Sequence, residues 1–164
     1  MFNIIRAKPD NSLAIATVHV KSWQETYTNI FSEQYLKNLS VENRKNQWDQ
    51  LLTNPDVFTF VVKEHNMIVG FFSLEKRNYP QENSPYLASL YLLKKYQGRG
   101  IGKEMFFYSR NFWHSLNYNF MYIECLEQNS TLSFYKKFGS VVIEKIKNND
   151  SPKLTELLLK NHLY

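Results

Sequence analysis

The sequence predicts a single domain of the α+β (mixed α/β) class over residues 1–164. Stretches with the alternating apolar residues of strands follow stretches with the i, i+3, i+4 pattern of helices. We find no internal repeat, low-complexity tract or linker that would divide the chain. A chain of 164 residues is long enough to bury about 70% of its unfolded surface. We expect the order strand, two helices, three strands, helix, strand, helix and two strands.

The beginning of the chain predicts a strand and two helices. "FNIIRAK" has the composition of a short strand, and Asp10-Asn11-Ser12 supplies capping oxygens for a helix that begins near Leu13. A second helical stretch begins at about Ser32 or Ser40 and runs to Leu52, before the turn "TNPD". These two helices precede the main group of strands.

The rest of the chain predicts three strands, a helix, and a mixed C-terminal region. The β-rich runs "VFTFVVKEH" and "MIVGFFSLEKR" join through His65-Asn66 in the manner of a hairpin, and "YLASLYLLKKY" is the third strand. Apolar spacing predicts a helix over 101–117, followed by the strand "YNFMYIECLE" and a short helix that stops at Gly139. "SVVIEKIK" predicts a strand, whereas "LTELLLKNHLY" fits a strand or a helix equally.

Composition excludes several classes of protein. The single cysteine, Cys125, rules out an internal disulfide and a cysteine zinc cluster, and we expect it to be a small buried apolar residue. The start of the chain lacks the apolar run of a signal peptide, and no run reaches the roughly 18 apolar residues of a membrane span, so we expect a cytoplasmic protein with no membrane partner. Lysine and arginine exceed aspartate and glutamate by 20 to 15, but the basic residues are scattered, which disfavours nucleic acid as a partner.

Three of the five glycines lie on alternate residues, Gly98, Gly100 and Gly102, before the predicted helix. Glycine allows positive φ and close approach of a ligand, so the cluster indicates a demanding turn or a bound ligand. Neither the G-x-G-x-x-G fingerprint nor the Walker A spacing fits. What remains is a strand, a glycine turn and a helix N-terminus, which favours an anion, with an empty turn as the alternative. The flanking cations are Lys94, Lys95, Arg99 and Lys103, with Lys136 and Lys137 later in the chain.

The letters of this turn also match a known pattern. "QGRGIG" resembles the Q/R-x-x-G-x-G/A motif of the GNAT superfamily of N-acetyltransferases. "SLYLLKKYQGRGIGKEMF" is similar to that family's fourth strand and third helix, "FYKKFG" to its fourth helix, and "HVKSWQETY", more loosely, to its first helix. The resemblance implies a GNAT-like fold: a central, mostly antiparallel sheet of six to seven strands with a splayed strand pair, flanked by about four helices.

The resemblance implies acetyl-CoA as a co-substrate and no metal. Its pyrophosphate would lie on the glycine turn, and its pantetheine between the fourth and fifth strands, with the Leu92 amide polarising the thioester carbonyl. Tyr135 matches the family tyrosine beside the sulfur and would be the general acid. From the residues alone, these strand positions and this ring are ordinary packing residues. The implied cofactor-binding residues are Leu90, Tyr91, Leu92, Gln97, Gly98, Arg99, Gly100, Ile101, Gly102, Lys103 and Asn129.

Two departures from the family pattern bear on this assignment. The asparagine that contacts pantetheine in many members lies seven residues before the tyrosine, which is Gln128 here, whereas Asn129 lies six before it. Either residue fits, and we favour Asn129 because it can also cap the following helix. The Gly-Phe that ends this helix in many members is Gly139-Ser140 here.

Of the residues that the reaction requires, the general base is the one that the sequence determines least. Many relatives have a glutamate at the position that we match to Tyr86. Glu25, His19, Glu127 or an ordered water are the alternatives. His19, Trp23 and Tyr27 lie on one helix face, and such residues are usually core, but the family's first helix overhangs the acceptor cleft. We therefore assign Trp23 and Tyr27 to the acceptor site.

The sequence does not identify the acceptor. The resemblance implies direct transfer to a primary amine of a small molecule, amino acid, polyamine, peptide or protein, in a ternary complex. We prefer a small amine or a peptide end, because cations near the cleft would repel a polycation. The alternative function is a non-catalytic CoA-binding module of the same fold. The aromatic-rich composition is compatible with a homodimer.

Overall fold

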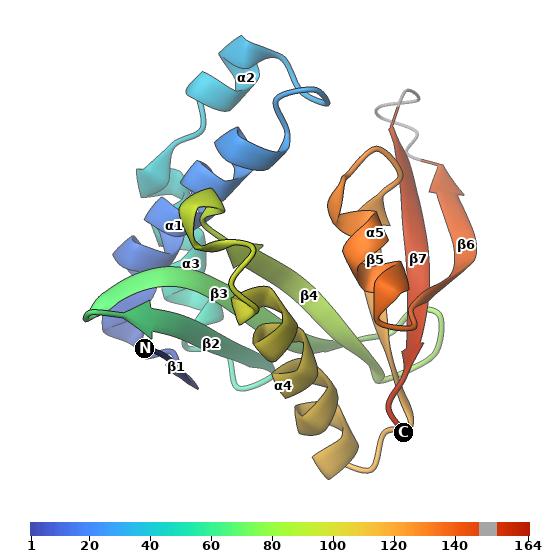
Figure 1. Cartoon of the computed structure of the whole chain (residues 1–164). Coiled ribbons are helices and arrows are strands. Elements are labelled where there is room, and N and C mark those ends of the chain that lie inside the picture. Colours follow the sequence, from blue (N-terminus) through green and yellow to red (C-terminus); the bar gives the residue numbers. More distant parts are fainter. Residues whose placement is uncertain (148–153) are drawn as a thin grey trace.

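The strands form one sheet in the computed structural model, which describes residues 1–147 and 154–164. Their order across the sheet is β1-β2-β3-β4-β5-β7-β6 (Figure 1). All neighbouring pairs are antiparallel except β4 and β5, which are parallel. The mostly antiparallel sheet is therefore confirmed, and the ambiguous C-terminal segment is a strand. The strands are β1 (Phe2–Arg6), β2 (Val57–Glu64), β3 (Met67–Arg77), β4 (Ser84–Leu92), β5 (Phe120–Leu126), β6 (Val141–Lys147) and β7 (Thr155–His162).

Within the described residues there is one α-helix more than the sequence predicted, because the second helical stretch is two helices. Ser32 and Ser40 each begin one: the Ser32 hydroxyl accepts the Tyr35 N–H, and the Ser40 hydroxyl accepts the Asn43 N–H, both at 3.1 Å. The described α-helices are α1 (Ser12–Thr26), α2 (Glu33–Lys37), α3 (Val41–Leu51), α4 (Ile101–Ser115) and α5 (Thr131–Lys137), with 3₁₀ turns η1 (Pro9–Asn11) and η2 (Lys94–Tyr96).

Local turn chemistry explains two connections. His65 and Asn66 both adopt positive φ, 48° and 65°, which gives the tight turn of the predicted hairpin between β2 and β3. The capping prediction for α1 is wrong in detail. The Asn11 side chain accepts the Lys8 N–H at 2.9 Å and so closes η1 rather than capping α1.

Helices cover both faces of the sheet (Figure 1). On one face, α1 and α3 pack Ile15, Ala16 and Trp48 against Val61 and Phe71 of the central strands. Trp48 of α3 therefore packs on the sheet. Within the described residues, no helix is long and apolar enough to cross a membrane.

The larger apolar cluster lies on the opposite face, under α4 and α5. Phe106 and Trp113 of α4 and Tyr135 of α5 pack with Phe72 and Leu87 of the sheet, and Trp113 is fully buried. This cluster fixes both helices against the middle of the sheet, so α4 begins directly beside the end of β4.

The sheet opens between β4 and β5. These strands pair only at Tyr86 with Tyr122 and at Leu87 with Ile123, and beyond that point they diverge (Figure 1). β5 instead pairs with β7 along its whole length, from Phe120 to Leu126. The splayed pair implied by the GNAT resemblance is therefore present, and it leaves backbone groups of β4 without a neighbouring strand.

Candidate active site

A pocket of about 830 Å³ lies where β4 and β5 diverge. Residues from α1, β4, the glycine turn, β5 and α5 line it. Of the residues predicted for cofactor and acceptor binding, it brings together Trp23, Tyr27, Leu90, Tyr91, Leu92, Gln97, Gly98, Gly100, Gly102, Lys103, Asn129 and Tyr135.

The glycine turn needs its glycines for conformation and for space. Gly98 and Gly100 adopt φ of +75° and +80°, which disfavours any other residue. A Cβ at either position would meet no atom within 4 Å, and both residues line the pocket. Gly100 precedes α4 without a side-chain cap, so the first N–H groups of α4 are not satisfied by a capping side chain. The turn therefore fits an anion such as a pyrophosphate.

The side chains of this turn divide between the pocket and the protein. Lys103 lines the pocket, and Lys137 of α5 lines it as well. Arg99 points elsewhere, because both guanidinium Nη atoms bond the Glu64 carboxylate at 3.0 and 2.5 Å, and its side chain lines a smaller cavity. Ile101 is buried in the apolar core. Arg99 and Ile101 can therefore contribute to the pocket only through their main chain.

The backbone of β4 presents hydrogen-bonding groups to the opening. The Leu93 N–H bonds the Val69 carbonyl of β3 at 3.0 Å. Because the hydrogen-bonding groups of successive strand residues face opposite edges, those of Leu90 and Leu92 point away from β3, toward β5. The Gln97 side chain donates to the Leu92 carbonyl at 2.9 Å, so it secures the end of β4.

Two protonated groups lie together on the α5 side of the pocket. Tyr135 has 6% of its surface exposed, and burial raises the pKa of its phenol, with Cys125 and Tyr91 close by. Burial raises the pKa of the Cys125 thiol to about 11. Both groups stay protonated at neutral pH, and the Tyr135 hydroxyl can act as a proton donor. Cys125 is small and buried as expected, and it also lines the pocket.

Asn129 rather than Gln128 is among the residues that line the pocket. Its side-chain oxygen accepts the Thr131 N–H at 2.9 Å, which gives it the expected capping role at the start of α5. Its amide nitrogen donates to the Tyr27 hydroxyl at 3.3 Å. These two bonds fix Asn129 between α5 and α1.

Aromatic rings form the α1 side of the pocket. Trp23, Tyr27 and Phe31 all line it, and the rings of Trp23 and Phe31 stack with their centres 5.6 Å apart. The Trp23 indole N–H donates to the Tyr91 hydroxyl at 3.0 Å. This bond joins α1 to β4 across the pocket, so the orientation of the ring is set by both elements.

The sequence of the chain matches the family model of the acetyltransferase (GNAT) domain over residues 25–157. The chain belongs to the GNAT acetyltransferases. This acetyltransferase is 28% identical over 141 residues to the uncharacterized N-acetyltransferase YuaI of Bacillus subtilis strain 168. The aligned region covers 85% of this chain and 80% of that protein.

Solved structures share the fold of this acetyltransferase over its full length. The PaiA N-acetyltransferase of Thermoplasma acidophilum, in complex with coenzyme A, has a TM-score of 0.78 at 22% identity and covers 99% of each chain. The ribosomal-protein-S18-alanine N-acetyltransferase of Escherichia coli has a TM-score of 0.72 at 11% identity, covering 99% of this chain and 94% of that one.

The side chains that the sequence offered as candidate bases in this acetyltransferase do not line the pocket. Burial, with a smaller contribution from Arg44, lowers the pKa of His19 to about 3, and its Nδ1 accepts the Trp48 indole N–H at 3.1 Å. Glu25 accepts the Lys94 N–H at 2.8 Å and Glu127 pairs with Lys145 at 2.7 Å, and neither lines the pocket. Each of the three is held by a partner outside the pocket.

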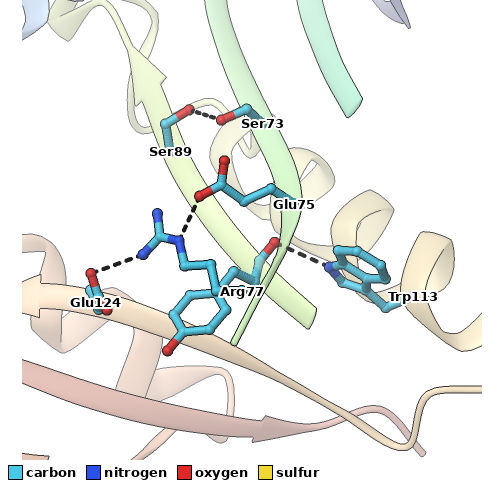
Figure 2. A network of polar contacts seen from close by, with 7 residues as sticks. Ser73, Glu75, Arg77, Ser89, Trp113 and Glu124 are labelled. Atoms are coloured by element: carbon cyan, nitrogen blue, oxygen red, sulfur yellow. Dashed lines mark hydrogen bonds and ion pairs between the residues drawn. The ribbon is translucent and has the colours of Figure 1, made fainter. Parts of the chain in front are cut away.

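The sequence reasoning missed Glu124, which lines the pocket on β5. Arg77 of β3 donates to Glu124 at 2.9 Å and to Glu75 at 2.5 Å, so one guanidinium holds two carboxylates (Figure 2). Ser89 was also missed; it bonds Ser73 at 2.6 Å across β3 and β4 (Figure 2). The alternation of β5 was the available signal for Glu124, since its neighbours Ile123 and Cys125 are apolar.

Tyr86 occupies the position where many relatives have a glutamate. Tyr86 is fully buried, and the Arg77 guanidinium lies 4.5 Å from the centre of its ring. Burial raises the pKa of Tyr86 to about 12, so it cannot serve as a base at neutral pH. Among the described residues, no group of three or more His, Cys, Asp and Glu side chains is arranged to hold a metal ion.

Proposed function

We propose that this acetyltransferase transfers an acetyl group from acetyl-CoA to a primary amine by direct attack in a ternary complex. The observation that carries the proposal is a single pocket that passes between β4 and β5, with a glycine turn at one end and an aromatic wall at the other. Two molecules can meet in such a pocket from opposite faces of the sheet, so no covalent acyl-enzyme is required.

The residues of the pocket fit acetyl-CoA, which supplies an acetyl group activated as a thioester. The open space at Gly98 and Gly100, beside the start of α4, suits the pyrophosphate, and Lys103 and Lys137 add positive charge. The backbone groups of Leu90 and the Leu92 N–H would pair with pantetheine, and Asn129 would contact it from the turn before α5. Main-chain groups from Gln97 through Gly102 complete this set.

The proton balance assigns a role to Tyr135. The nitrogen of the neutral amine bonds the carbonyl carbon of the acetyl group, the carbon–sulfur bond breaks, and the sulfur takes up a proton. The nitrogen then loses one proton to water in the pocket. Tyr135 would donate a proton to the sulfur and recover that proton through the same water, and its raised pKa keeps it protonated until then. An alkylammonium has a pKa of about 10.4, so water in the pocket would carry its proton to solvent before attack.

The release of CoA thiol, measured with a panel of primary amines, tests this proposal. We expect amine-dependent release, with initial-rate lines that intersect when both substrates are varied, as a ternary complex requires. Parallel lines would indicate a covalent acyl-enzyme and contradict direct attack. Tight acetyl-CoA binding without release for any amine would favour the non-catalytic module instead.

A further inference from the structure

Charged side chains divide between the two ends of the pocket. Among the described residues that line it, the cations are Lys103 and Lys137, at the end that carries the glycine turn and α5. The carboxylates in the same described lining are Glu124 of β5 and Glu156 of β7. The cations expected to repel a polycationic acceptor therefore lie with the proposed phosphate site.

Strand geometry places both carboxylates on one face of the sheet. Ile123 and Cys125 point into the cluster under α4 and α5, so Glu124 between them points to the opposite face of the sheet, the face on which α1 packs against β3 and β4. Glu156 is the register partner of Leu126, two residues along β5 from Glu124. Diagonal neighbours of this kind lie about 7 Å apart, so the two carboxylates form one acidic end.

The network around Glu124 fixes its position and keeps the acidic end negative. Arg77 bonds Glu124 and Glu75 together, so two carboxylates share one guanidinium and one negative charge is left over (Figure 2). The Glu124 side chain remains 33% exposed. It is therefore held in place while still open to a ligand.

The aromatic wall suits a cationic ligand as well. Tyr27 and Phe31 line the pocket on the α1 side, and faces of aromatic rings attract ammonium groups. The Arg44 guanidinium, which is not among the lining residues, already lies 5.3 Å from the centre of the Trp23 ring. Tyr27 and Phe31 are thus the rings that an acceptor would meet.

Building on the proposed function, we infer that the preferred acceptor is an amine with a second positive charge, which Glu124 and Glu156 bind while the first amine is acetylated. A diamine or a longer polyamine has this chemistry. A monoamine of the same length would lack the second attraction, and an amino acid of the same length would place its carboxylate against Glu124 and Glu156.

Three amines of matched length test the inference: 1,4-diaminobutane, butylamine and 4-aminobutanoate. Each presents a primary amine, but the far end is positive, neutral or negative. We expect kcat/KM to be about tenfold higher for the diamine than for butylamine, and about tenfold lower for 4-aminobutanoate, with the spread narrowing as salt is added. Equal kcat/KM for the three amines would overturn the inference while leaving the proposed acetyl transfer intact.

Glu124→Gln tests the residue, because glutamine keeps the shape and removes the charge. The preference for the diamine over butylamine should fall from about tenfold to about twofold. Glu127→Gln is the matched control on the same chain segment, paired with Lys145 outside the pocket, and should retain the preference. An unchanged preference in Glu124→Gln would refute the assignment, provided that acetyl-CoA titration shows a folded donor site. Failure of every amine to react, with acetyl-CoA bound, would instead overturn the proposed function and this inference with it.

Discussion

Replacement of Gly100 by alanine adds one methyl group at the residue before α4. The backbone there has φ of +80°, a conformation that costs a non-glycine residue about 1–2 kcal/mol. The methyl group would meet no protein atom within 4 Å, so no steric clash adds to this cost. For a chain of this size, the melting temperature should fall by about 2–4 °C per kcal/mol.

The effect on acetyl-CoA binding should be larger than the effect on stability. The added methyl group occupies space beside the pocket, where we place the pyrophosphate. Loss of one hydrogen bond to a charged group costs about 1.5–3 kcal/mol, which corresponds to an affinity about 10 to 100 times weaker. Isothermal titration with acetyl-CoA measures the affinity, and thermal unfolding measures the stability.

Gly139→Ala separates the two effects. Gly139 has nearly the same φ, +85°, and its Cβ would lie 3.8 Å from the Asn161 amide nitrogen, an ordinary contact. Gly139 does not line the pocket, so this variant should lose a similar amount of stability but keep its affinity within about twofold. Equal affinity loss in both variants, or none in Gly100→Ala, would refute the proposed pyrophosphate site.

Three further perturbations test other residues. Tyr135→Phe should lower turnover about 100-fold and leave acetyl-CoA affinity unchanged. The control Tyr108→Phe, on the surface of α4, should change neither turnover nor affinity. Full turnover in Tyr135→Phe would remove its role as general acid. Asn129→Ala should weaken acetyl-CoA binding in a titration and Gln128→Ala should not, and the reverse result would assign the contact to Gln128. The stability of the chain should depend on pH through His19. The unfolded chain binds a proton on His19 below about pH 6.5, whereas the folded chain does so only near pH 3. Because protons then stabilise the unfolded chain, the free energy of unfolding should fall by ~2 kcal/mol from pH 7 to pH 5. Denaturant titrations should show that His19→Gln reduces this fall, and an equal fall in the variant would assign it to other groups.

Features that depend on neighbouring residues could be predicted from the sequence. Ser32 and Ser40 were the alternative starts predicted for one helix, and in the structure each caps a helix of its own. His65-Asn66 gives the hairpin because both residues tolerate positive φ. The glycine turn followed from spacing alone, since a strand, alternate glycines and a helix leave few arrangements of the backbone.

Features that depend on residues far apart in the chain could not be predicted in this way. The pairing of Arg77 with Glu124 joins β3 to β5 across the end of β4, and no sequence pattern near either residue predicts it. The partners of the candidate bases could not be predicted for the same reason: His19, Glu25 and Glu127 are each engaged by a residue of another element. The resemblance to a family supplied the proposed donor site, whereas the proposed acceptor end combines residues of α1, β5 and β7 that are far apart in the chain.

We place the pyrophosphate of acetyl-CoA on the glycine turn that holds Gly98, Gly100 and Gly102. Titration of the wild-type chain with acetyl-CoA, and separately with S-acetylpantetheine, tests it most directly, because the smaller thioester lacks the pyrophosphate. We predict one acetyl-CoA site per chain and an affinity for S-acetylpantetheine that is weaker by about 100-fold or more. Equal affinity for the two thioesters, or no binding of acetyl-CoA to the folded chain, would contradict the claim.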